Sequence, residues 1–260
     1  PTTNHQRAGG TGLARGREME KLQTRELTFS YEGKRVFDRL NLSVKEGEFV
    51  SILGPSGCGK STLLNILAGI LPAQSGEVLV DGQRVLGLSS HFAYMPQQDL
   101  LLPWKTILDN VCLYGKLHHR EAQAREKALS NMETFGLAGY ENSYPRELSG
   151  GMRQRAAFLR TALCEADILL LDEPFGALDV ITRGEMQDWL LSMRARLGAT
   201  TVLVTHDIEE ALYLSDRILI MQGAPAAFAK EIVLEQEQRD REWLFAQRAL
   251  YGEIYYFLKG

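Results

Sequence analysis

Apolar residues recur along the chain with two different periods, which predict strands and helices in alternation. Between residues 22 and 31, Leu27, Phe29 and Tyr31 occupy every second position, as in a half-buried strand. Residues 168–171 are continuously apolar, which is typical of a parallel strand buried on both faces. The same patterns predict strands at 36–44, 48–53, 77–80, 93–95, 201–204 and 217–221, and helices at 60–68, 149–164, 179–197, 208–214 and 240–258.

This alternation predicts an α/β fold around a mixed sheet, with an antiparallel β part near the N-terminus. It is interrupted between residues 106 and 136 by a purely helical pattern, which indicates a helical subdomain inserted at about 98–160. Residues 1–20 are rich in Gly, Thr and Arg and poor in apolar side chains, so we expect a disordered tail. Residues 21–260 then form one domain, and its last helix is expected to dock on the domain surface.

Composition narrows the classes of function. The chain has 260 residues, of which 45% are apolar and 24% charged, as in ordinary globular proteins. Its net charge is −4, so the chain as a whole lacks the positive charge that favours binding of nucleic acid. No apolar run approaches the ~20 residues that span a bilayer, so we expect any membrane role to depend on a partner protein. Cys58, Cys112 and Cys164 lack paired spacing, which disfavours a disulfide framework or a zinc site.

Residues 54–62 carry a strong chemical signal. They read Gly-Pro-Ser-Gly-Cys-Gly-Lys-Ser-Thr and fill the pattern G-x-x-x-x-G-K-[ST] between a predicted strand and a predicted helix. Glycines let successive N–H groups curl around phosphate oxygens, Lys60 adds positive charge for the β- and γ-phosphates, and Ser61 offers a hydroxyl to Mg²⁺. The alternative is a glycine-rich turn without a ligand, which the strand–loop–helix context disfavours. The expected nucleotide-binding residues are Gly54, Pro55, Ser56, Gly57, Cys58, Gly59, Lys60, Ser61 and Thr62.

Two carboxylates, Asp172 and Glu173, follow the apolar run at 168–171. Open α/β sheets bind their ligands at the carboxyl ends of the strands. Asp172 is therefore suited to hold Mg²⁺, through a water, and Glu173 to accept a proton from the water that attacks the γ-phosphate. The alternative is a surface turn with two solvated acids, which the presence of a phosphate loop disfavours.

Residues 148–155 read Leu-Ser-Gly-Gly-Met-Arg-Gln-Arg, and here the chain resembles the ATP-binding subunits of ABC transporters. Residues 148–154 match the signature of that family. Ser149 and two glycines at a helix start form a second anion-binding terminus. A capped helix start alone would explain Ser149 but not Gly150 and Gly151. The resemblance implies that this segment binds the γ-phosphate held by the phosphate loop of a second subunit.

Further matches follow in the family's order over about residues 22–221. Tyr31 matches an aromatic residue that stacks on adenine, and residues 177–179 match a loop that crosses the dimer interface. Gln97 matches a glutamine that reaches Mg²⁺ and the attacking water; Gln98 is the neighbouring alternative, and the spacing to Pro103 favours Gln97. The resemblance implies ATP and Mg²⁺ as cofactors, with Lys60, Gln97, Glu173 and His206 catalytic, Ser61, Gln97 and Asp172 at the metal, and Tyr31, Ser149, Gly150, Gly151 and Asp179 as further nucleotide contacts.

Residues 101–104 and 173–183 resemble importers for nitrate, sulfonates, taurine and related small molecules. The resemblance implies a peripheral ATPase subunit at the cytoplasmic face of the membrane. It would pair head to tail with a second copy, drive permease subunits and serve a substrate-binding protein indirectly. Trp104 would then anchor a cytoplasmic helix of the permease, or alternatively pack into the helical subdomain. The transported solute cannot be read from this chain, since other subunits select it.

Other classes stay open at this level: a soluble ABC ATPase, for example in cluster assembly, an exporter subunit, and a nucleotide-binding module without hydrolysis. Glu173 and His206 disfavour the module without hydrolysis, and residues 101–104 disfavour cluster assembly. DNA-repair relatives carry a long inserted coiled coil and translation relatives carry two such domains, and neither feature is present in the sequence.

Overall fold

The computed structural model describes residues 20–235 and 239–260, so the expected tail at 1–20 lies outside the described residues except for Glu20. The strands are β1 Glu20–Tyr31, β2 Lys34–Lys45, β3 Phe49–Leu53, β4 Ser75–Val80, β5 Gln83–Val85, β6 Phe92–Met95, β7 Ile168–Asp172, β8 Thr200–Thr205, β9 Arg217–Gly223 and β10 Ala226–Val233. The helices are α1 Lys60–Leu67, α2 Ile107–Val111, α3 Leu113–Leu117, α4 Glu121–Asn131, the 3₁₀ turn η1 Pro145–Glu147, α5 Gly150–Ala162, α6 Val180–Leu197, α7 Ile208–Leu214, α8 Arg241–Ala246 and α9 Arg248–Lys259.

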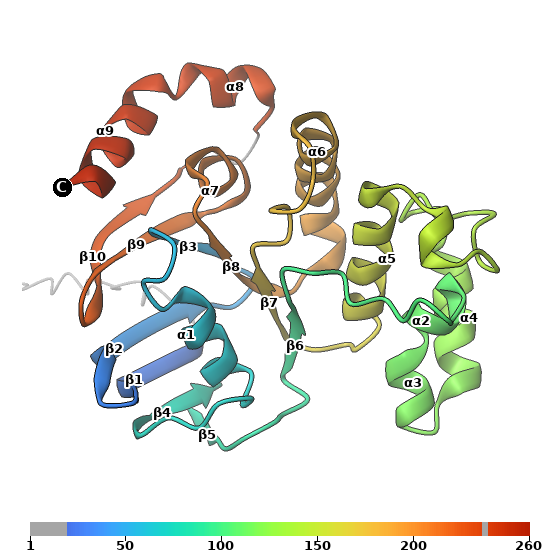
Figure 1. The fold of residues 1–260 in the computed structure, drawn as a ribbon, viewed down its shortest axis with the longest axis horizontal. Helices are drawn as coiled ribbons and strands as arrows, with labels where there is room; N and C mark the ends of the chain where they lie inside the picture. Colours follow the sequence, from blue (N-terminus) through green and yellow to red (C-terminus); the bar gives the residue numbers. More distant parts are fainter. Residues whose placement is uncertain (1–19, 236–238) are drawn as a thin grey trace, which may run out of the picture.

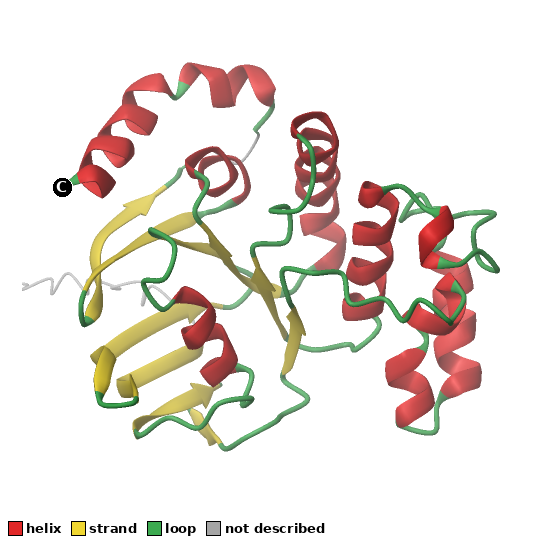
Figure 2. Cartoon of the chain, viewed as in Figure 1, coloured by secondary structure: helices red, strands yellow, loops and turns green. Residues whose placement is uncertain are grey.

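The strands form one mixed sheet in the order β5-β4-β1-β2-β10-β9-β3-β8-β7-β6 (Figures 1 and 2). Strands β9, β3, β8, β7 and β6 run parallel to one another, whereas β5, β4, β1 and β2 are antiparallel. Strand β10 pairs with β9 as a hairpin and meets β2 at one described position, Ala226 opposite Phe37. The predicted α/β fold with an antiparallel part near the N-terminus is confirmed.

The central strands separate two hydrophobic cores, because successive side chains of a strand point to opposite faces. Along β7, Ile168 and Leu170 join the core that contains α1, whereas Leu169 and Leu171 join the core that contains α5 and α6. All five residues of β7 are buried, as the continuous apolar run predicts. The parallel strands are thereby held rigidly, and their carboxyl ends emerge along one edge of the sheet.

The helical regions differ from the expectation in detail. The helical stretch expected at 106–136 is divided into α2, α3 and α4, which gather with α5 at one end of the molecule (Figure 1). The prediction of a single helix at 240–258 is wrong in one respect, because the helix is interrupted at Gln247 and forms two helices, α8 and α9. Strand β10 was not predicted. In its second half, exposed and half-buried residues alternate, so no apolar pattern marks it.

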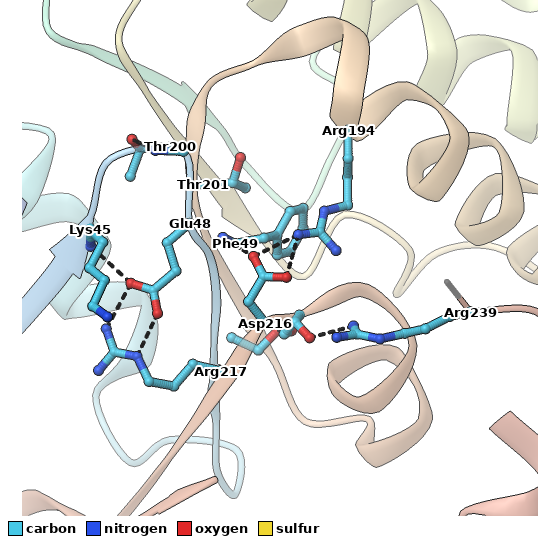
Figure 3. Close-up of polar contacts among 12 residues, drawn as sticks. Lys45, Glu48, Phe49, Arg194, Thr200, Thr201, Asp216, Arg217 and Arg239 are labelled. Carbon is cyan, nitrogen blue, oxygen red and sulfur yellow. Dashed lines mark hydrogen bonds and ion pairs between the residues drawn. The ribbon is translucent and has the colours of Figure 1, made fainter. Parts of the chain in front are cut away.

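Ion pairs connect neighbouring strands and helices at the amino ends of the central strands (Figure 3). Arg217, at the start of β9, donates from Nε and Nη2 to the two carboxylate oxygens of Glu48, at 2.7 and 2.9 Å. Asp216 accepts from Arg194 of α6 at 2.6 and 2.7 Å and from the backbone N–H of Phe49 at 2.9 Å. These bonds connect β3, α6 and β9 at the edge opposite the phosphate loop.

Candidate active site

The phosphate loop connects β3 to α1 in the predicted strand–loop–helix context. Its backbone conformation and close contacts explain why glycine occupies several of its positions. Gly57 and Gly59 have φ of 79° and 106°, in the region that favours glycine. A Cβ on Gly54 would lie 2.4 Å from the carbonyl oxygen of Met221, and a Cβ on Gly59 would lie 2.6 Å from Val36. The loop can therefore keep this path only with glycine at these positions.

Lys60 is the first residue of α1 and is buried, with 4% of its surface exposed. Its Nζ donates to the carbonyl oxygens of Gly54 at 2.8 Å and Pro55 at 2.9 Å. The ammonium group therefore lies inside the curve of the loop, where it adds positive charge to the helix N-terminus. An ammonium has three donors, so these two carbonyls leave one donor for a phosphate oxygen.

The other predicted loop residues lie around Lys60. Pro55, Ser56, Gly57 and Ser61 are exposed, whereas Cys58 and Thr62 are half-buried. Burial raises the pKa of the Cys58 thiol, and the nearby positive charge of Lys60 offsets part of this shift. A raised pKa keeps the thiol protonated at neutral pH, which agrees with Cys58 as a small loop residue rather than a nucleophile.

Asp172, at the end of β7, lies against the start of α1. Its Oδ1 accepts from Ser61 Oγ at 2.9 Å, and its Oδ2 accepts from the Tyr94 hydroxyl at 3.0 Å. Burial raises the pKa of Asp172, although both hydrogen bonds oppose the shift. Tyr94 was missed by the sequence analysis; it lies in a predicted strand, but no motif marks it. Burial and the neighbouring Asp172 raise its pKa well above the ordinary value, so it remains a donor.

Glu173 is the point where three loops of the site meet. Its Oε2 lies 3.1 Å from His206 Nδ1 and 3.5 Å from Gln97 Nε2. Its backbone has φ of 44°, which is uncommon for a residue with a Cβ, and its N–H donates to the carbonyl of Val204 at 2.9 Å. Backbone outliers of this kind concentrate at functional sites. The structure thus brings together Gln97, Glu173 and His206, which follow β6, β7 and β8.

A buried acid lies in the first turn of α7, just after His206 in the chain. Glu210 is 4% exposed and accepts from Thr205 Oγ1 at 2.6 Å. Burial raises its pKa to about 7, with Thr205 opposing and Asp207 adding to the shift. The sequence analysis missed Glu210, and a signal was present: a carboxylate lies among apolar residues of the predicted helix, four residues after His206.

The oxygen donors next to the phosphate loop fit a hard divalent cation. Ser61 Oγ and Asp172 Oδ1 are 2.9 Å apart, and the side-chain amide of Gln97 reaches the adjacent Glu173. Hydroxyl, carboxylate and amide oxygens are ligands that suit Mg²⁺. In the structure it is the amide nitrogen of Gln97 that faces Glu173, so its oxygen points elsewhere.

Tyr31 lies at the end of β1 and is 49% exposed, with its ring edge-to-face against Phe29 at 4.8 Å between centroids. The ring is thus held in place by Phe29 while half of its surface faces solvent. This leaves Tyr31 accessible for stacking on a flat ligand.

The signature segment caps α5 on a different part of the surface. Ser149 accepts from the N–H of Met152 at 3.2 Å as the N-cap. A Cβ on Gly151 would lie 2.8 Å from Thr182 of α6, so close packing of the two helices explains this glycine. Asp179 caps α6 by accepting from Thr182 and Ile181, and these hydrogen bonds lower its pKa. In the described contacts, none of these residues touches the phosphate loop of its own chain.

The site combines a glycine loop of the kind that binds phosphates with an aspartate, a glutamate and a histidine at the neighbouring strand ends. This combination defines a nucleotide-hydrolysing protein of the phosphate-loop class. The family model for ABC transporters matches residues 37–176, and the chain belongs to this family as an ATP-binding ATPase. The predicted family, fold class and ATPase activity are thereby confirmed.

Curated relatives and solved structures agree with this assignment. The chain is 50% identical over 191 residues to an aliphatic sulfonates import ATP-binding protein of Rhodococcus jostii, covering 74% of this chain and 75% of the relative. It is 45% identical over 222 residues to a formylaminopyrimidine import ATP-binding protein of Halalkalibacterium halodurans, covering 85% and 87%. A dimeric ATP-binding cassette, MJ0796, bound to ADP and Pi matches with a TM-score of 0.70 and 31% identity, over 83% of this chain and 99% of that one.

Proposed function

We propose that this chain is the ATPase subunit of an importer for a small organic solute, and that it works as a head-to-tail pair around two molecules of Mg·ATP. The observation that carries the proposed hydrolysis is the convergence of Gln97 and His206 on Glu173, next to the phosphate loop. This arrangement gives a general base and two polar groups that can orient a water against the γ-phosphate.

In the proposed reaction, the phosphate loop and Lys60 bind the β- and γ-phosphates and stabilise negative charge on them. Glu173 accepts the proton of the attacking water, and its backbone, tied to Val204, keeps the carboxylate at the edge of the sheet. Gln97 orients the same water, and His206 donates to the γ-phosphate. Ser61, Gln97 and Asp172 would hold Mg²⁺, which would supply positive charge to neutralise the phosphates.

The signature residues would act on the second copy. Ser149 and Gly150 lie at a helix N-terminus, where N–H groups favour an anion, and Ser149 is exposed. Because these residues have no described contact with their own phosphate loop, we assign them, with Asp179 and Tyr31, to nucleotide held between two chains. ATP would then favour the closed pair, since it contacts both copies only in that state.

Residues 100–104 are proposed to contact the permease. Trp104 is 71% exposed, so it does not pack into the helical region, which excludes one of its two predicted roles. The loop is nevertheless held firmly, because Asn110 accepts from the N–H of Leu102 at 2.7 Å and donates to its carbonyl at 3.1 Å. A rigid loop with exposed Leu100 and Trp104 suits a hydrophobic anchor in a partner.

We propose that the helical subdomain at about 98–160 carries this loop and the signature residue Ser149 together, so that closure of the pair moves the permease contact. In the described part of the chain, no helix is both long and apolar enough to cross a bilayer. We place the subunit at the cytoplasmic face of a membrane, bound through the permease, with a substrate-binding protein acting indirectly. The sulfonate and formylaminopyrimidine relatives support a small organic solute as cargo.

The test is Glu173→Gln, with Glu133→Gln as the exposed control. Loss of the base should lower ATP turnover roughly 100-fold or more, because general base catalysis contributes at least that factor. ATP binding should persist, and size-exclusion chromatography with light scattering should detect an ATP-dependent dimer of the variant. Turnover by Glu173→Gln at the rate of the control would exclude Glu173 as the base. A variant that binds ATP but stays monomeric at all concentrations would count against the paired site.

A further inference from the structure

Arg183 of α6 joins two loops that follow neighbouring strands. Strands β7 and β8 are parallel neighbours, so the loops after them emerge at the same edge of the sheet (Figure 1). Arg183 lies one turn into α6, and its backbone N–H donates to the carbonyl of Asp179 at 2.8 Å. Its guanidinium reaches back over the helix start and donates from Nη2 to the carbonyl of Leu178 at 3.1 Å. One end of this side chain is therefore fixed to the loop at 177–179.

The other end of the guanidinium faces Asp207, the residue that follows His206. Arg183 Nη1 lies 3.7 Å from Asp207 Oδ2. The second oxygen of this carboxylate, Oδ1, caps α7 by accepting from the N–H groups of Glu209 and Glu210 at 2.8 and 3.2 Å. The backbone N–H of Asp207 also donates to Thr205 Oγ1 at 3.0 Å. The position of His206 is thus tied to a carboxylate whose outer oxygen is oriented toward Arg183.

The contact between Arg183 and Asp207 is incomplete. At 3.7 Å the pair is an ion pair but not a hydrogen bond. Arg183 Nε is buried and has no hydrogen-bond partner among the described residues. A buried N–H without an acceptor is unfavourable, whereas Nε and a terminal nitrogen of one guanidinium can bind a carboxylate together. In Arg183 the terminal nitrogen on the same side as Nε is Nη2, which donates to Leu178, whereas Asp207 faces Nη1 on the other side. An approach of Arg183 to Asp207 would turn the Nη1 contact into a hydrogen bond, so the pair has a second, tighter arrangement available.

We propose that Arg183 is a positioning residue that couples the loop at 177–179 to His206. The inference rests on the proposed function, in which a second copy docks against residues 177–179. A displacement of the Leu178 carbonyl during docking moves the guanidinium, whose Nη1 then donates a hydrogen bond to Asp207. Asp207 fixes the start of α7, and His206 is held against Glu173. Docking of the second copy therefore tightens the hold on His206, whose Nδ1 already lies 3.1 Å from Glu173 Oε2 in the single chain.

The kinetic test compares Arg183→Gln, Asp207→Asn and the double variant with Arg196→Gln, an exposed arginine on the same helix. Asparagine keeps an oxygen to cap α7, so the fold is preserved while the charge is lost. Each single variant should lower kcat for ATP about tenfold, because a displaced group loses alignment, with KM and Tm within about twofold and a few degrees of the wild type. The double variant should be no slower than the slower single variant.

A structural role alone would lower Tm and leave kcat per folded molecule unchanged, which would overturn the inference. Losses that multiply in the double variant would also overturn it, because the two residues would then act separately. If Arg183→Gln does not fold, Asp207→Asn with the wild-type arginine decides the kinetic question from the other side of the pair.

A second measurement separates this inference from the proposed function. The imidazole Cε1–H resonance of His206, assigned by its loss in His206→Gln, should shift in Arg183→Gln without nucleotide and stay unchanged in Arg196→Gln. The resonance of His91, which pairs with Asp167, serves as an internal reference. A wild-type chain that does not hydrolyse ATP would contradict the proposed function while the resonance still reports on coupling. An unchanged His206 resonance in Arg183→Gln would contradict the coupling itself.

Discussion

The two edges of the central sheet use charge in opposite ways. At the amino ends of the strands, acids and bases are matched: Glu48 takes two hydrogen bonds from Arg217, and both side chains are about nine-tenths buried (Figure 3). Near the carboxyl ends, Asp172 accepts from Ser61, Glu173 faces His206, and the buried Glu210 accepts from Thr205. Burial raises the pKa of Asp172, and it raises that of Glu210 to about 7.

We infer from this difference that the amino ends of the strands serve the fold and the carboxyl ends serve the reaction. Matched, buried pairs join strands and helices, and they are costly to break because one charge would be left alone. Acids with raised pKa values are kept where a ligand can balance their charge, which is typical of active sites. Changes at the amino edge should therefore lower stability at any pH, whereas changes at the carboxyl edge should alter activity or the pH dependence of stability.

The largest expected effect on stability comes from breaking the matched edge. Arg217→Met removes two of the hydrogen bonds to the buried carboxylate of Glu48, which also accepts from the N–H of Lys45, and we expect the free energy of unfolding to fall by about 4 kcal/mol. Urea denaturation measures this change, and Arg25→Met, at an exposed ion pair with Glu77, is the control. ATP turnover per folded molecule should stay near that of the wild type. A large loss of turnover without a loss of stability would erase the distinction between the edges.

A smaller effect on stability is expected from Glu210→Gln, which should raise the free energy of unfolding rather than lower it. The pKa of Glu210 is raised from 4.5 to about 7, so the folded state holds the proton more tightly than the unfolded state. The stability of the wild type should therefore fall as pH rises from about 4.5 to about 7 and change little above this range. Glu210→Gln cannot ionise and still accepts from Thr205, so at pH 8 it should be more stable by roughly 3 kcal/mol.

Thermal and urea denaturation from pH 4.5 to 8 measure this difference, and Glu209→Gln, at the exposed neighbour, is the control. If Glu210→Gln and the wild type kept the same pH dependence, Glu210 would not carry the raised pKa.

The smallest effect is expected at the hydrogen bond between Tyr94 and Asp172. Tyr94→Phe removes one donor that orients this carboxylate, and loss of such outer partners weakens metal binding about tenfold. The Mg²⁺ concentration for half-maximal ATP turnover should rise accordingly, while Tm changes little. Tyr140→Phe, at an exposed tyrosine, should leave it unchanged. An equal response of both variants would mean that Tyr94 does not orient Asp172.

The sequence predicts the parts of the fold whose signals are local. Strand β7 and helix α1 follow directly from a continuous apolar run and from the phosphate-loop pattern. Strand β10 could not be predicted, because half of its positions face solvent and its pairing with β9 is its main support. The break at Gln247 was also missed, since it depends on how α8 and α9 pack on the rest of the chain.

The candidate site shows the same limit. Residues within motifs, such as Lys60 and Glu173, were identified from spacing, and the structure places Lys60 inside its loop and Glu173 beside His206. Glu210 accepts from Thr205, only five residues away, and its local signal was overlooked. Tyr94 and Arg183 gained no role from the sequence, because each acts on a residue that is distant in the chain. Their partners can be known only after the strands are ordered in the sheet.

The alternation of β7 between two cores limits how this protein can change during evolution. Its odd and even positions face different cores, and it ends in two acids with different neighbours. Inserting one residue into β7 would exchange the faces of every following side chain and would rotate Asp172 and Glu173 into each other's surroundings. Substitutions that keep volume are open to this strand, but a change of its length is not. Drift in length is therefore confined to loops away from this strand.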